Sequence, residues 1–213
     1  MPSVTRPAPS HRQRRGQVEV RVLEATEALL RGGARFTQLG VERISREAGI
    51  SRSTFYVHFA DKSALLIRLA ERATEEIFAA SDEWWEHDHS GGTGPLAEVM
   101  LKLIRLNRRH AEVVGAVAEV ASYDDAVAAF WRERLHGYAD YMRRKLEEEQ
   151  RAGRVAAEVD CRSTASIIIS SVERSITEHV RASGPGGDAA FARQLARSAW
   201  LTIFGDAPGT SAA

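Results

Sequence analysis

The sequence predicts an all-α protein of about nine helices. Apolar residues recur at intervals of three and four along most of the 213 residues, which is the spacing of one face of an α-helix. Glycine, proline and capping residues such as Asp and Ser separate these periodic segments. The chain has no convincing strand that could pair with another. Helices packed on helices are therefore the expected architecture.

The three helices expected first are short and closely spaced. Val18, Val22, Ala25 and Leu29 define a helix from Gln17 to Gly32 and Gly33. The next two run over residues 41–48 and 52–59, and Gly49, Ile50 and Ser51 form the turn between them. Gly49 supplies the positive φ that such a turn needs, and Ser51 can cap the second helix. This arrangement predicts a helix–turn–helix.

The stretch Phe55-Tyr56-Val57-His58-Phe59 has a second interpretation, because it alternates apolar and polar residues as a strand does. A strand needs a partner for its backbone groups, and no other segment offers one. We therefore expect a helix that stacks Phe55 and Phe59 on one face.

Six longer helices are expected after it. Asp61 caps a helix that reaches Trp84, and Pro95 begins one that reaches Leu106 after the Gly-rich stretch 87–95. The others are expected at 111–120, at about 124–151, from the cap Asp160 to Val180, and from Asp188 to Ile203.

The composition of the chain limits the classes of protein to which it can belong. No run of about 18 apolar residues could span a membrane, and the basic N-terminus lacks the apolar core of a secretory signal. The single cysteine, Cys161, cannot form an intramolecular disulfide, which fits a reducing cytoplasm. Net charge is zero, but residues 1–60 hold ten Arg, five Glu and no Lys or Asp. This +5 excess favours contact between the N-terminal part and a polyanion.

The helix expected at 52–59 has an outward face that a purely structural helix does not need. Ser53, Tyr56 and Val57 point away from Phe55, and Arg52 stands at the N-terminal end. Arginine binds guanine edges or phosphate, hydroxyl groups bind phosphate, and valine contacts thymine methyl groups. These residues predict a DNA recognition helix. The alternative is a small helical hairpin with a solvated polar face.

The run VERISREAGISRSTFYVHFADKSALL resembles the DNA-binding signature of the TetR family of bacterial transcription regulators, and the resemblance covers about residues 17–69. It implies DNA contacts by Arg52, Ser53, Thr54, Tyr56 and His58, and a phosphate contact by Lys62. The family commonly has Ser or Thr where this chain has Gly40, so only backbone N–H groups can bind phosphate there. The full set of expected DNA-binding residues is Gly40, Arg43, Arg52, Ser53, Thr54, Tyr56, His58 and Lys62.

The resemblance also implies a domain organisation. We expect a disordered basic arm at 1–16, the helix–turn–helix domain at 17–63, a ligand-binding and dimerisation domain at 64–205 and a flexible tail at 206–213. Arg12, Arg14 and Arg15 of the arm could enter the minor groove, or the arm could be a solubilising tail. Residues 161–182 are apolar on more than one side, which favours a homodimer interface over a buried helix in a monomer.

The second domain is expected to enclose an apolar effector site, although any single candidate residue is more often plain core than part of such a site. The last two helices are similar to the branch that contains the mycobacterial ethionamide-resistance repressor. That similarity implies that Trp131 and Trp200 face a lipophilic channel, and its asparagines fall near Ile169 and Val172 here. The candidates are Met100, Leu103, Trp131, Leu135, Tyr138, Met142, Ile169, Val172 and Trp200.

No residue set indicates catalysis, a cofactor or a metal. His87 and His89 flank Asp88 in a Gly-rich loop but have no third ligand at a useful spacing.

The sequence thus predicts a cytoplasmic, homodimeric repressor that leaves a palindromic operator when a small hydrophobic ligand binds. Two alternatives stay open. One is an all-helical enzyme or lipid-binding protein that uses the same pocket, and the other is a nonspecific DNA-binding protein without an effector.

Overall fold

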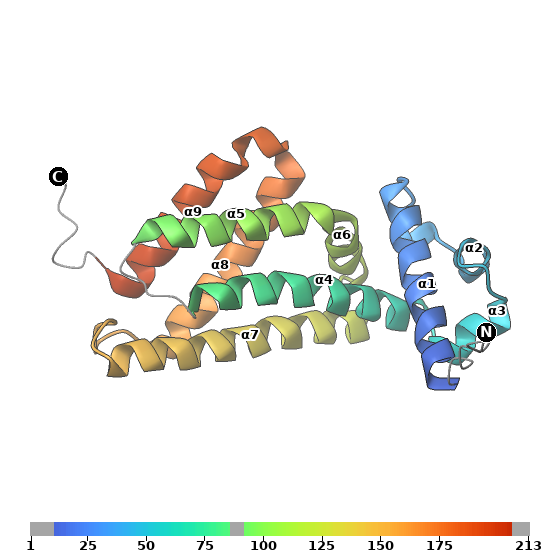
Figure 1. Cartoon of the computed structure of the whole chain (residues 1–213), viewed down its shortest axis with the longest axis horizontal. Coiled ribbons are helices and arrows are strands. Elements are labelled where there is room, and N and C mark those ends of the chain that lie inside the picture. Colours follow the sequence, from blue (N-terminus) through green and yellow to red (C-terminus); the bar gives the residue numbers. More distant parts are fainter. Residues whose placement is uncertain (1–10, 86–91, 206–213) are drawn as a thin grey trace, which may run out of the picture.

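The computed structural model describes residues 11–85 and 92–205, and these residues form nine α-helices and no strand. The all-α prediction is confirmed (Figure 1). The α-helices are α1 (His11–Arg31), α2 (Val41–Glu47), α3 (Arg52–His58), α4 (Lys62–Trp85), α5 (Thr93–Arg109), α6 (Ala111–Val120), α7 (Asp125–Arg151), α8 (Cys161–Ala182) and α9 (Asp188–Phe204). Two 3-10 turns, η1 (Phe36–Gln38) and η3 (Pro185–Gly187), connect them.

The expected N-caps are present. The Ser51 side chain accepts a hydrogen bond of 3.0 Å from the Thr54 amide, and Asp61 accepts one of 2.7 Å from the Ala64 amide. Asp160 caps α8 by accepting from two amides, each at 3.0 Å. Because these caps satisfy amides that have no partner inside the helix, they fix where each helix begins.

Two helices begin earlier than predicted. Helix α1 begins at His11, so residues 11–16 are helical and not part of an irregular arm. This segment is rich in Arg and Gln, which are good helix formers, and Gly16 costs the helix only about 1 kcal/mol. Helix α5 begins at Thr93, two residues before Pro95. Proline is accepted there because amides in the first turn need no intrahelical partner.

The helix–turn–helix has the expected geometry. Gly49 has φ +64°, and the Ile50 amide donates to the Ser45 carbonyl across the turn. Phe55 is fully buried and Phe59 nearly so, and their rings lie 5.3 Å apart. The alternation that suggested a strand therefore belongs to a helix that packs its two phenylalanines inward.

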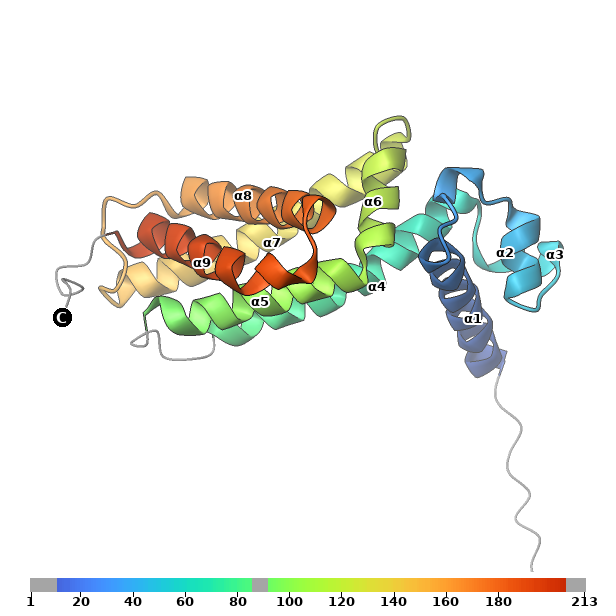
Figure 2. The same cartoon turned by 90° about the horizontal axis from the view of Figure 1, so that it is seen from above.

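The buried apolar residues form two clusters, and α4 contributes residues to both. The first contains α1, α2, α3, the first half of α4, α6 and Val127 of α7. The second contains the rest of α4 with α5, α7, α8 and α9. Figures 1 and 2 show α6 between the group α1–α3 and the larger helical body. Helices α4 and α6 thus connect the two parts of the molecule.

The helical body is built on two main pairs, α5 with α9 and α7 with α8. A buried ion cluster fastens three of these helices. Both carboxylate oxygens of Asp188 on α9 accept from Arg108 on α5, at 2.9 and 2.7 Å. His179 Nε2 on α8 lies 2.9 Å from the same carboxylate. The bidentate geometry makes this a strong contact.

Candidate DNA-binding surface and ligand cavity

Helix α3 exposes the residues expected to contact DNA. Tyr56 is 46% exposed and Val57 is 64% exposed, although Phe55 and Phe59 of the same helix turn are buried. Arg52 is exposed, and its guanidinium carbon lies 5.8 Å from the centre of the Tyr56 ring. Such a cation–π contact holds the two side chains on the same face of the helix.

Three hydroxyl groups gather at the N-terminus of α3. Ser51 Oγ lies 2.8 Å from both Ser53 Oγ and Thr54 Oγ1. Ser53 is exposed and Thr54 is half-buried. Hydroxyl groups and helix N-terminal amides are the groups that hold phosphate oxygens in DNA complexes.

The remaining expected contacts differ in their surroundings. Gly40 and Arg43 are exposed at the start of α2, where Gly40 provides no side-chain cap. His58 is half-buried, and its Nδ1 has no hydrogen-bond partner. Burial lowers the pKa of His58, and the charge of Arg15 lowers it further. A neutral imidazole is therefore favoured at this position.

Lys62 was expected to bind phosphate, but the structure gives its ammonium group another role. The Nζ atom donates to the Phe36 and Thr37 carbonyls at 2.9 and 3.3 Å. It also lies 5.0 Å from the centre of the Phe36 ring. Desolvation lowers the pKa of Lys62. These contacts tie the start of α4 to η1, so two of its three N–H groups are already used.

The arm residues expected in the minor groove are only partly described. Arg15 is exposed on α1, whereas the side chains of Arg12 and Arg14 lie outside the described structure.

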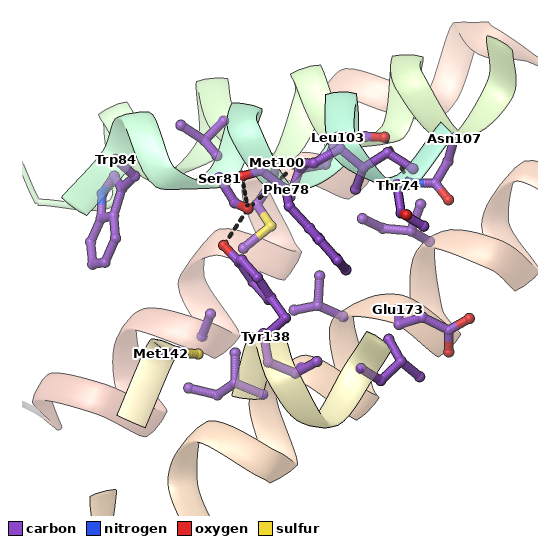
Figure 3. Close-up of a pocket in the computed structure, with 18 of the residues that line it drawn as sticks. Thr74, Phe78, Ser81, Trp84, Met100, Leu103, Asn107, Tyr138, Met142 and Glu173 are labelled. Atoms are coloured by element: carbon purple, nitrogen blue, oxygen red, sulfur yellow. Dashed lines mark hydrogen bonds between the residues drawn. The ribbon is translucent and has the colours of Figure 1, made fainter. Parts of the chain in front are cut away.

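An apolar cavity that is partly open to solvent lies within the helical body. It runs between α4 and α5 on one side and α7 and α8 on the other, and α9 contributes Ala199 and Ile203 (Figure 3). The volume of the cavity is about 120 Å³. Apolar cavities of about this volume can bind a small organic molecule.

The structure brings together eight of the nine candidate cavity residues, the exception being Trp200. Trp200 instead packs against Phe204, with ring centres 4.4 Å apart. The α9 residues that reach the cavity are Ala199 and Ile203, which lie on one face because they are four apart. Trp200 is turned away by about 100° from Ala199. Trp200 therefore does not line this cavity, and ligand binding by the other eight residues stays a prediction.

Sequence reasoning missed the contribution of α4. Thr74, Phe78, Ser81, Trp84 and Trp85 all line the cavity. The signal was available, since Trp84 falls on the inward helical face of α4 and two adjacent tryptophans are uncommon. Tryptophan pairs favour sites that bind flat or apolar groups.

Polar groups in the cavity are few. The Tyr138 hydroxyl donates to Ser81 Oγ, and burial raises the Tyr138 pKa. Glu173 is half-buried on α8, and burial raises its pKa as well. Asn107 donates from Nδ2 to the Leu103 carbonyl at 3.0 Å. Each of these groups is neutral or tends toward its neutral form, as expected where water is scarce.

The described residues also limit other chemistry. They contain no group of three or more His, Cys, Asp and Glu side chains placed to hold a metal ion. His87, Asp88 and His89 lie outside them. Cys161 is buried, and burial raises the pKa of its thiol. In the ranges 11–85 and 92–205, no helix has the length and apolar character needed to cross a membrane.

Comparison with known proteins identifies the N-terminal domain. Residues 22–69 match the family described as "Bacterial regulatory proteins, tetR family". No curated protein gives a significant match to the chain. The similarity to the ethionamide-resistance branch stays a prediction.

Solved structures match over nearly the whole chain. A TetR transcription regulator from Haloarcula marismortui is 18% identical with a TM-score of 0.70, and the match covers 88% of this chain and 98% of that one. The regulator FadR of Bacillus subtilis in complex with stearoyl-CoA is 19% identical with a TM-score of 0.67, and the match covers 87% of this chain and 98% of that one. Salmonella enterica GusR is 17% identical with a TM-score of 0.66, and the match covers 86% of this chain and 95% of that one.

At these identities the structural matches establish the fold, and the sequence match establishes the domain that carries α2 and α3. The N-terminal domain therefore belongs to the TetR family of bacterial regulatory proteins, and the chain as a whole has the fold of TetR-family transcriptional regulators.

Proposed function

We propose that the protein is a cytoplasmic, homodimeric repressor that binds a palindromic operator and leaves it when a small hydrophobic ligand fills the cavity. The observation that carries this proposal is that one chain combines an exposed recognition helix with an apolar cavity between its C-terminal helices. Residues Arg52, Ser53, Thr54 and Tyr56 would contact DNA, with Arg43 and the Gly40 amide region nearby. FadR, which binds stearoyl-CoA in its complex, has the same fold.

Helices α8 and α9 support the homodimer. Ile167 on α8 is 58% exposed and Leu201 on α9 is 42% exposed. Large apolar side chains on the surface of adjacent helices favour burial against a second copy. A two-fold dimer would place two α3 helices in successive major grooves, which is why the operator is expected to be palindromic.

Contacts of the helix–turn–helix part with α6 and with the start of α7 give ligand binding a way to affect DNA binding. Thr37 of η1 donates to Glu119 of α6 at 3.3 Å, and Ser63 of α4 donates to Asp124 at the start of α7 at 2.5 Å. Helix α6 also packs against α1, α4 and α8. A ligand that moves the helices around the cavity would therefore shift the population of DNA-binding conformations.

The test is binding of the full chain to a library of genomic DNA fragments at about physiological salt. The wild type should enrich fragments that share a palindromic site. Tyr56→Ala should abolish this enrichment, because it removes an exposed aromatic hydroxyl from α3. Tyr123→Ala is the matched control, since Tyr123 is 66% exposed but lies in the turn after α6.

Equal binding of all fragments would contradict the proposal and favour a nonspecific DNA-binding protein. Enrichment that survives Tyr56→Ala would show that α3 does not read the sequence.

A further inference from the structure

The cavity wall contains an acidic side chain but no basic one. The lining residues include no Lys, Arg or His, and Glu173 is the one residue among them that can carry a charge below the range in which tyrosine ionises. Arg134 comes near from outside, where its Nε donates to Thr74 Oγ1 at 3.0 Å and its guanidinium lies over the Phe78 ring. Arg134 does not itself line the cavity. A ligand with an anionic group would thus enter without a cationic partner, which is unfavourable in an apolar space.

Glu173 has little support from the protein itself. Its Oε1 accepts one long hydrogen bond, of 3.4 Å, from Thr177 Oγ1. No ion pair to Glu173 is found among the described residues, and the next residue, Arg174, is 74% exposed and pairs with Glu178. Burial disfavours the charged carboxylate, as the raised pKa of Glu173 indicates. The protein therefore leaves the Glu173 carboxylate short of hydrogen-bond donors, and a bound ligand could supply them.

The same end of the cavity offers further acceptors. Figure 3 shows Asn107 and Thr74 near each other and on the same side as Glu173, away from Trp84 and Met142. Asn107 uses its amide nitrogen for the Leu103 carbonyl, which leaves Oδ1 to accept a hydrogen bond. Thr74 Oγ1 already donates to the Ala70 carbonyl. This end therefore accepts hydrogen bonds more readily than it donates them.

The rest of the cavity is aromatic and aliphatic. Phe78, Trp84, Trp85, Trp131 and Tyr138 line it together with Leu, Ile, Val and Met side chains. Aromatic faces attract cations as well as alkyl chains. The wall of the cavity is thus apolar over most of its residues and has one acidic residue, Glu173, at one end.

We propose that the cavity is selective for apolar ligands that carry a single ammonium-type cation, with Glu173 pairing the cation and Asn107 accepting a second hydrogen bond. The inference deepens the proposed function and rests on it, because it names the ligand class of the same cavity. It separates this chain from a regulator of anionic acyl ligands that shares its fold.

The experiment compares three probes with the same alkyl chain: decylamine, decanol and decanoate. Binding to the full chain is followed by tryptophan fluorescence at neutral pH, below the concentrations at which the probes aggregate. Three of the four tryptophans line the cavity, so occupancy should change the signal. Decylamine should bind tighter than decanol by on the order of tenfold, and decanoate weaker than decanol.

Glu173→Gln should remove the preference for decylamine over decanol, while decanol binding should stay within about twofold. Glu178→Gln is the matched control, because Glu178 lies on the same helix but does not line this cavity. Far-ultraviolet circular dichroism verifies that both variants are folded.

Decanoate binding as tightly as decylamine would overturn the inference, and so would a preference for decylamine that survives Glu173→Gln. Binding of none of the three probes would also overturn it. These results are independent of the DNA experiment, since a palindromic site enriched by the wild type would still support the DNA-binding part of the proposed function.

Discussion

Adjacent residues of α3 have opposite surroundings. Phe55 is fully buried, whereas Tyr56 is 46% exposed. One step of 100° along the helix is enough to turn one ring into the core and the next toward solvent. The ring planes lie at 86° to each other with centres 5.4 Å apart, so the buried Phe55 supports the exposed Tyr56. The roles of both residues follow from spacing alone, which is why the sequence could predict them.

Lys62 and Trp200 show what helical spacing does not predict. Both were placed on the correct helix, but the sequence does not show what each long side chain reaches. Lys62 extends back to two carbonyl groups of η1, and Trp200 packs along α9 onto Phe204. Tertiary contacts decide the direction of long side chains, and periodicity says only which face they leave from.

Gly40 gives a prediction for a single residue. Its φ and ψ of −80° and 148° suit any amino acid, and a Cβ atom would meet nothing within 4 Å. Gly40→Ser should raise the free energy of unfolding by about 0.3 kcal/mol, because the hydroxyl group can cap α2. It should also raise operator affinity about threefold through one more phosphate contact. Thermal unfolding and fluorescence anisotropy measure the two effects.

Gly184→Ser is the control for this change. Gly184 has a similar φ of −74° and open space around it, but it lies before η3, far along the chain from α2. Operator affinity that is unchanged in Gly40→Ser, or raised equally in Gly184→Ser, would contradict the prediction.

At the scale of elements, α4 and α6 matter most because they belong to both parts of the molecule. Leu65, Leu66 and Leu69 of α4 are buried with the helix–turn–helix, while Ala80 and Trp84 of the same helix are buried near the cavity. The sequence predicted α4 as one helix but placed a domain boundary between residues 63 and 64. The apolar core is continuous across that boundary, and only the packing reveals this.

The cluster of Arg108, His179 and Asp188 gives a prediction at the same scale. The pKa of Asp188 is lowered from 3.8 to about 2. The main cause is the hydrogen bonding from the Arg108 guanidinium, and the hydrogen bond with His179 adds to it. A depressed carboxyl pKa means that the contact stabilises the fold above about pH 4 and loses its effect as pH falls through about 2. Asp188→Asn should therefore lower the free energy of unfolding by about 1–3 kcal/mol at pH 7.

This difference between Asp188→Asn and the wild type should shrink between about pH 4 and pH 2. Urea unfolding at several pH values measures it. Asp140→Asn serves as the control, since the Asp140 side chain is 57% exposed and pairs with Arg143 on the surface of α7. A loss of stability in Asp188→Asn that is the same at every pH would contradict the assignment to the ionised carboxylate.

At the scale of the whole molecule, the sequence predicted the kind of structure better than the content of the cavity. Helical spacing and caps identified every α-helix of the described residues, although α1 begins six residues before its predicted start at Gln17. Eight inward-facing residues of α5, α7 and α8 were found in the same way. Apart from Tyr138, the polar residues of the cavity were missed, because Thr74, Ser81, Asn107 and Glu173 look like ordinary surface residues until the helices are packed. The proposed ligand preference rests on Glu173 and Asn107, so helical spacing could not predict it.

The proposed function depends on three features of the molecule. They are an exposed recognition helix, a cavity with one acidic end, and the helices α4 and α6 between them. The central claim is that filling the cavity changes DNA binding. Coupling between two sites of one protein is typically 1–3 kcal/mol, which corresponds to roughly 5- to 150-fold in affinity. Such an effect is easily measured.

The most direct measurement is the affinity of the full chain for its enriched DNA fragment, by fluorescence anisotropy, with and without decylamine at a concentration that saturates the tryptophan signal. The account predicts that decylamine weakens binding at least about fivefold. The effect should be lost in Leu103→Trp, in which a larger side chain fills the cavity. An operator affinity that stays the same while the cavity is occupied would contradict the central claim.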